Sequence, residues 1–129
     1  MADSVVVADW FRHVESDLAI ADRAPGSGVL LEHLCFHAQQ AAEKAVKAVL
    51  ISFGVVPPKV HDIERLFSLV GEHVDVPEDV REGARLSPYA AITRYPADLG
   101  EVDEAEWRRS VALARRVAAW ARGVTGHGI

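Results

Sequence analysis

The chain has 129 residues, half of them hydrophobic and about a quarter charged, a balance that fits one soluble globular domain and excludes a disordered chain. The net charge of −5 excludes a protein that is basic overall, so binding of nucleic acid would depend on a local positive patch. The single cysteine excludes an intramolecular disulfide and favours a reducing, cytoplasmic setting.

The first half of the chain predicts two helices joined by a turn. Apolar residues recur at steps of three and four from Val7 to Ala21, which predicts a first helix over residues 4–23. Residues 25–28, a Pro-Gly-Ser-Gly run, are typical of a turn. A second helix is predicted over residues 29–53, and its apolar stretches are too short to span a bilayer, so we expect no membrane insertion.

The second helix has an apolar face and, on the opposite side, a polar stripe. At about 100° per residue, five polar side chains fall within an arc of roughly 80°: His33, His37, Gln40, Lys44 and Lys47. The stripe could supply a base and positive charge to a bound nucleotide or RNA, and it could equally be a solvated or dimer-facing surface. The two histidines have the spacing of metal ligands, but no third ligand lies nearby, so we predict no metal site.

Capping residues mark further helices in the second half of the chain. Asp62 has the position of an N-cap for a third helix that ends near Gly71. Residues 77–79, Pro-Glu-Asp, are suited to begin a fourth helix, because an amide donor is not needed there and the helix dipole favours acids. Ser87 and Pro88 are expected to end or kink that helix.

A connecting loop and a last helix complete the chain. Residues 89–100 are predicted to form the loop. Asp103 and Glu106 have the spacing of a capping box, which begins a helix that runs to about Arg122. The glycine-rich residues 123–129 are predicted to be a flexible tail.

No segment alternates with the period of two that is typical of strands, and no internal repeat is visible. The sequence therefore predicts one all-α domain over residues 1–129, an antiparallel up-and-down bundle of four to five helices.

Residues 35–50 of the second helix read CFHAQQAAEKAVKAVL and closely resemble the most diagnostic segment of HEPN domains (higher eukaryotes and prokaryotes nucleotide-binding). Other segments resemble that family in the same order, over roughly residues 7–121. They are Trp10 with the Asp17-Leu18 pair, the linker from Pro57-Pro58 to His61-Asp62, and Arg94-Tyr95-Pro96 before an alanine-rich last helix.

The resemblance implies a prokaryotic helical bundle that binds nucleotide or RNA without a cofactor and forms homodimers. It also implies a partner, because such proteins are often paired with a small nucleotidyltransferase in a toxin–antitoxin-like module. Many members of the family are metal-independent RNases in which an arginine is followed, after four to six residues, by a histidine.

The chain departs from that RNase pattern. Only Arg122 and His127 have the required spacing, and they lie in the glycine-rich tail, where we interpret the match as accidental because catalysis needs groups held in place. The resemblance places the arginine at Arg94, and no histidine follows it at residues 99–101. The sequence therefore assigns no catalytic residue.

Tyr89, Arg94 and Tyr95 place an arginine between two aromatic residues in the predicted loop. Such a group offers a phosphate contact and a surface on which a base stacks. The alternative is that both rings pack over the end of the bundle while Arg94 pairs with a carboxylate.

The sequence thus predicts a homodimeric nucleotide- or RNA-binding protein that works with a nucleotidyltransferase and lacks the usual RNase motif. One alternative is a metal-independent endoribonuclease with an atypical site. Another is a dimerising adaptor that binds a protein partner through the polar stripe.

Overall fold

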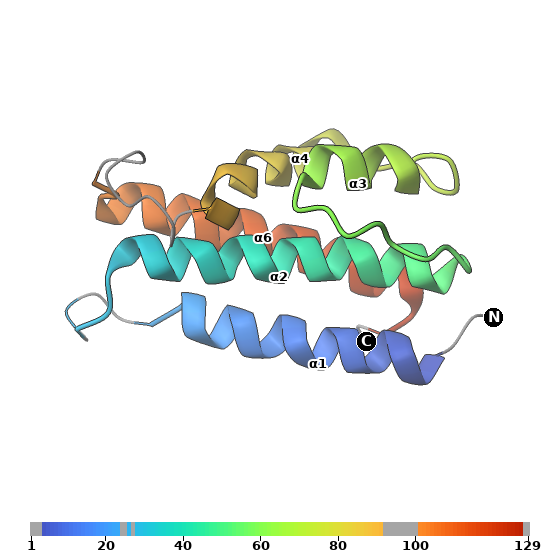
Figure 1. The fold of residues 1–129 in the computed structure, drawn as a ribbon, viewed down its shortest axis with the longest axis horizontal. Helices are drawn as coiled ribbons and strands as arrows, with labels where there is room; N and C mark the ends of the chain where they lie inside the picture. Colours follow the sequence, from blue (N-terminus) through green and yellow to red (C-terminus); the bar gives the residue numbers. More distant parts are fainter. Residues whose placement is uncertain (1–3, 24–25, 27, 92–100, 128–129) are drawn as a thin grey trace.

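The computed structural model describes residues 4–23, 26, 28–91 and 101–127, which form helices and no strand. The elements are α1 (Ser4–Ala21), α2 (Leu31–Ser52), α3 (Ile63–Val70), α4 (Glu78–Arg81), the 3₁₀ helix η1 (Glu82–Ala91) and α6 (Glu104–Thr125). This arrangement confirms the predicted all-α antiparallel bundle (Figure 1).

Helix α2 lies at the centre of the bundle. It packs against α1 and α6 along its length, and α3 and η1 cover a further side. Helix α1 runs antiparallel to both α2 and α6, whereas α3, α4 and η1 form a shorter layer across the bundle (Figure 1). Because neighbours surround α2, nearly all of its residues from Ala38 to Leu50 are buried.

The predicted helix ends are close to the observed ones, since the local capping chemistry is present. The Asp62 carboxylate accepts the backbone N–H of Glu64, and the Asp103 carboxylate accepts that of Glu106. At the end of α2, Gly54 has a φ of 79°, a left-handed conformation that suits glycine at a helix C-terminus.

The fourth predicted helix differs from the prediction. Its α-helical part, α4, lasts only four residues and continues as the 3₁₀ helix η1, so that Pro88 lies inside a helix rather than ending one. In this segment η1 lies close against α6, since a Cβ atom at Gly83 of η1 would lie 2.5 Å from Cγ2 of Val117 in α6. The predicted loop begins later than expected, because residues 89–91 belong to η1, and residues 92–100 lie outside the described residues.

The last helix is longer than predicted. It continues through Thr125, so the predicted tail begins with three helical residues. Gly126 ends the helix with a φ of 79°, and the backbone N–H groups of Gly126 and His127 both donate to the carbonyl of Arg122. The chain therefore turns at Gly126 and brings His127 back against the bundle.

The core contains apolar side chains from all the long helices, with Leu34, Phe67 and Leu86 among its largest fully buried members. Trp107 of α6 is also buried, and its indole N–H donates to the carbonyl of Ala21 at 2.7 Å. No helix within the described ranges combines the length and apolar character that crossing a membrane requires.

Candidate functional site

The polar stripe of α2 is partly buried, contrary to its predicted position opposite the core. Lys47 is only 9% exposed, and two further polar residues of α2, Gln39 and Glu43, are more deeply buried. The stripe is enclosed because α1 and the linker before α3 lie against it and supply polar partners of their own. Within the described residues every buried side-chain nitrogen or oxygen has a hydrogen-bond partner.

Asp17 of α1 joins two predicted site residues. Its carboxylate is buried, with Nδ1 of His37 at 2.9 Å from one oxygen and Nζ of Lys44 donating to the other at 2.7 Å. His37 and Lys44 remain about a quarter to a third exposed. Asp17 therefore fixes a histidine and an ammonium group side by side at the surface between α1 and α2.

Glu43 contacts one further predicted site residue, Lys47, directly and a second, Gln40, through Gln39. Its buried carboxylate accepts from Nζ of Lys47 at 2.9 Å and from Nε2 of Gln39 at 2.8 Å, and Nδ1 of His61 lies 2.9 Å away. Gln40 in turn donates to the amide oxygen of Gln39 at 2.7 Å. Burial acts to raise the pKa of Glu43, but the hydrogen bonds from Gln39, Lys47 and His61 outweigh it and lower the pKa below its ordinary value of 4.5.

This lowered pKa predicts a loss of stability in acid. The contribution of the Glu43 carboxylate should be fully present above pH 4.5 and should be lost as the pH falls through the lower pKa of the folded state. Urea unfolding between pH 3 and pH 6 measures it: the difference in free energy of unfolding between the parent protein and Glu43→Gln should narrow in acid. For Glu64→Gln, at an exposed position, the difference in free energy of unfolding from the parent protein should change little over this pH range.

The remaining predicted residues do not join these clusters. His33 is exposed near the start of α2. Tyr89 is in η1, and its hydroxyl donates to the carboxylate of Glu106. Burial and this bond raise the pKa of Tyr89. Arg94 and Tyr95 lie outside the described residues, so their predicted role stays a prediction.

The structure adds a hollow that the sequence prediction missed. It has a volume of about 330 Å³ and is lined by Asp9, Trp10 and His13 of α1 and by Lys44 of α2. Trp10 is half-buried, so its ring borders the hollow while packing on the core. The sequence offered one indication of this hollow, because Trp10 and His13 are three residues apart and share a face of the first helix. Only the packing of α1 on α2 brings Lys44 to the same hollow.

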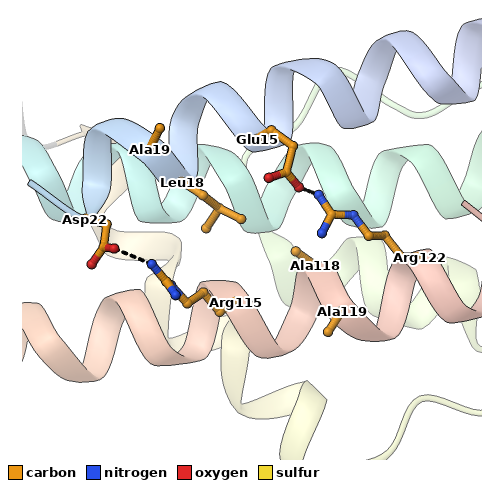
Figure 2. A pocket seen from close by; sticks show the side chains of 8 residues that line it. All are labelled: Glu15, Leu18, Ala19, Asp22, Arg115, Ala118, Ala119 and Arg122. Atoms are coloured by element: carbon orange, nitrogen blue, oxygen red, sulfur yellow. Dashed lines mark hydrogen bonds and ion pairs between the residues drawn. The ribbon is translucent and has the colours of Figure 1, made fainter. Parts of the chain in front are cut away.

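Arg122, at the end of the predicted last helix, and His127, in the predicted flexible tail, meet on the ring of Phe11. The imidazole of His127 stacks on that ring at 5.8 Å between centroids, and the guanidinium of Arg122 lies 5.7 Å from the ring centroid. Arg122 also forms an ion pair with Glu15 of α1 (Figure 2). A hollow of about 340 Å³ is lined by these residues with Ala8 and Arg12. The two side chains are thus held together rather than free.

Cys35 is fully buried, as the periodicity of α2 predicts. Burial raises the pKa of its thiol to about 11, and the hydrogen bond with Ser110 only partly opposes this effect. From an ordinary value of 9.0, such a shift lowers the thiolate fraction near neutral pH about a hundredfold.

We therefore expect Cys35 to resist dithionitrobenzoate in the folded protein and to react rapidly once the protein is unfolded in guanidinium chloride. Absorbance at pH 8 follows the reaction. If the thiol reacted as fast in the native protein as in the unfolded protein, this would contradict the buried position of Cys35.

The described residues contain no group of three or more His, Cys, Asp or Glu side chains placed to hold a metal ion.

Comparison with known proteins identifies the fold family. The family model of the HEPN domain matches residues 7–124. The crystal structure of TT1696 from Thermus thermophilus is similar, with 32% sequence identity and a TM-score of 0.79 over 92% of this chain and 97% of that one.

A second similar crystal structure is that of ST0689, an archaeal HEPN homologue, with 31% identity and a TM-score of 0.72 over 91% of this chain and 95% of that one. No curated protein matches. Since the family model covers nearly the whole chain and both structures share its fold and about a third of its sequence, the chain belongs to the HEPN domain family.

Proposed function

We propose that this HEPN protein is a homodimer that binds a nucleotide unit, free or within RNA, and works beside a small nucleotidyltransferase in a toxin–antitoxin-like module. The observation that carries the binding proposal is the hollow between α1 and α2, where Trp10 lies with His13 and Lys44. The nucleotidyltransferase partner rests on the family resemblance, and a neighbouring gene for such an enzyme would support it.

The chemistry of this hollow suits a nucleotide. The ring of Trp10 offers a face on which a base stacks, a contact worth about 1–3 kcal/mol per base. Lys44 supplies the cation for a phosphate, and Asp17 holds it in place through a 2.7 Å bond. The volume of about 330 Å³ lies within the range of small-ligand sites.

The other members of the stripe would then act as support rather than as contacts. His37 shares the Asp17 carboxylate with Lys44, so it helps to orient that carboxylate. Gln40 and Lys47 belong to the buried cluster around Glu43, which fixes α2 against the linker at His61.

Quenching of tryptophan fluorescence tests the proposal. We expect AMP or a short oligoadenylate, at low salt, to quench the parent protein and not Trp10→Phe, because Trp10 lines the hollow and the other tryptophans, Trp107 and Trp120, do not. Quenching by both ligands indicates a site for any nucleotide unit, whereas quenching by the oligomer alone indicates RNA.

Lys44→Gln should weaken binding on the order of tenfold, since it removes a charged phosphate contact. Lys59→Gln makes the same chemical change at an exposed position of the α2–α3 linker and should leave binding unchanged. The proposal fails if neither ligand quenches, or if the two lysine variants bind equally well.

A second candidate function is RNA cleavage without a metal, and the gathering of Arg122 and His127 on Phe11 favours it. His127 could accept the proton of a 2′-hydroxyl, and Arg122 could stabilise the charge that develops on the phosphate. In this role the guanidinium of Arg122 would leave the carboxylate of Glu15 and bind the phosphate of the substrate.

Incubation of RNA with the protein in EDTA tests this second function. His127→Ala should reduce cleavage about 10²–10⁴-fold, while His73→Ala, at an exposed histidine that stacks on Phe53, should not. Absence of cleavage by the parent protein would remove this candidate and leave the binding proposal untouched.

A further inference from the structure

An open hollow on the surface lies between α1 and α6 (Figure 2). It has a volume of about 470 Å³, and its lining comes only from these two helices and Asp22, the residue after α1. Both helices pack extensively on α2 but only little on each other, which leaves the hollow open between them. The apolar residues of its lining are one leucine, Leu18, and three alanines, Ala19, Ala118 and Ala119.

Two ion pairs bridge this hollow (Figure 2). Asp22 pairs with Arg115, and Glu15 pairs with Arg122, so the carboxylates lie along α1 and the guanidiniums along α6. Each pair of like charges is seven residues apart, and the two helices run antiparallel. The face therefore carries a negative row beside a positive row of equal spacing, and all four side chains are at least a quarter exposed.

We propose that a second copy of this chain docks on this α1–α6 face about a two-fold axis, an inference that rests on the proposed homodimer and names its surface. A two-fold axis that lies in the plane between the two copies, parallel to the helices, places α1 of one copy over α6 of the other. The negative row of each copy then meets the positive row of its partner. Each carboxylate gains a second guanidinium, so the charge pattern is complementary to itself.

The same pattern argues against other occupants. A nucleic acid would meet the carboxylates of Glu15 and Asp22 as well as the arginines, and the chain as a whole carries a net charge of −5. The positive row is also periodic, as in helices that pair lengthwise. Arginine recurs every seventh residue at Arg108, Arg115 and Arg122, and exposed alanine does so at Ala105, Ala112 and Ala119.

The size of the face fits a reversible dimer. Helix α1 has 18 residues and is therefore about 27 Å long. Two such helices side by side, each about 10 Å wide, offer roughly 500 Å² per copy, at the low end of specific interfaces. Because exposed ion pairs contribute much of this contact, the dimer should weaken as the salt concentration rises.

Sedimentation equilibrium over a range of protein concentrations tests the proposal. Arg115→Glu should raise the dimer dissociation constant on the order of tenfold or more, because it places like charges together across the axis. Arg65→Glu makes the same change on an exposed position of α3 and should leave the constant unchanged. The exchanged double variant Asp22→Arg/Arg115→Glu should restore dimerisation.

Ala119→Gln gives a second measurement that leaves every charge in place, and its larger side chain should also weaken the dimer. Circular dichroism establishes that each variant is folded. The proposal is overturned if the parent protein stays monomeric, or if folded Arg115→Glu and Ala119→Gln both dimerise like the parent. Nucleotide quenching at Trp10 should persist in Arg115→Glu, so failure of the dimer and failure of the binding site are distinguishable.

Discussion

Replacing Glu43 by alanine should lower the free energy of unfolding by about 3–5 kcal/mol, the range found when one partner of a buried ion pair is removed. The variant leaves the ammonium of Lys47 buried, at 9% exposure, without its carboxylate. It also removes the acceptor for the side chains of Gln39 and His61. Urea unfolding monitored by circular dichroism measures the change.

Two further variants isolate the cause. The double variant Glu43→Leu/Lys47→Met removes both charges while filling the space, and it should recover most of the lost stability. Glu64→Ala breaks an exposed ion pair with Arg81 and should cost less than about 1 kcal/mol. A small loss in Glu43→Ala, similar to that in Glu64→Ala, would mean that the Glu43 cluster is solvated rather than buried.

Replacing Gly83 by alanine should lower the free energy of unfolding by about 1–3 kcal/mol, because the new methyl group overfills a packed contact. Its Cβ atom would lie 2.5 Å from Cγ2 of Val117, so η1 would have to move away from α6. Thermal or urea unfolding measures the loss. Val117→Ala removes the opposing methyl groups, so the double variant should be more stable than the sum of the two single losses predicts.

Gly123 provides the matched control for this substitution. It lies in α6 with nothing within 4 Å of the position that a Cβ atom would take. Gly123→Ala should therefore stabilise the protein by about 0.5–1 kcal/mol through helix propensity alone. If Gly83→Ala and Gly123→Ala had the same sign, the close approach of η1 to α6 would not be what excludes a side chain at Gly83.

The sequence by itself determined the helical elements of this protein, because their signals are local. The spacing of apolar residues located α1 and α2 to within about two residues at each end, and the caps at Asp62 and Asp103 located the starts of α3 and α6. The family resemblance also depended on a continuous segment of α2. Each of these signals lies within one continuous stretch of the chain.

The tertiary structure decided which polar groups are buried and which ones meet. The stripe of α2 reads as a surface in isolation, but Asp17 and His61 approach it from segments that are distant in the sequence. The sequence predicts that His127 lies in a flexible tail just after Arg122, yet both side chains lie on Phe11 of α1, and Arg122 also pairs with Glu15. The period of a helix shows which residues share a face, whereas the burial of that face depends on what packs against it.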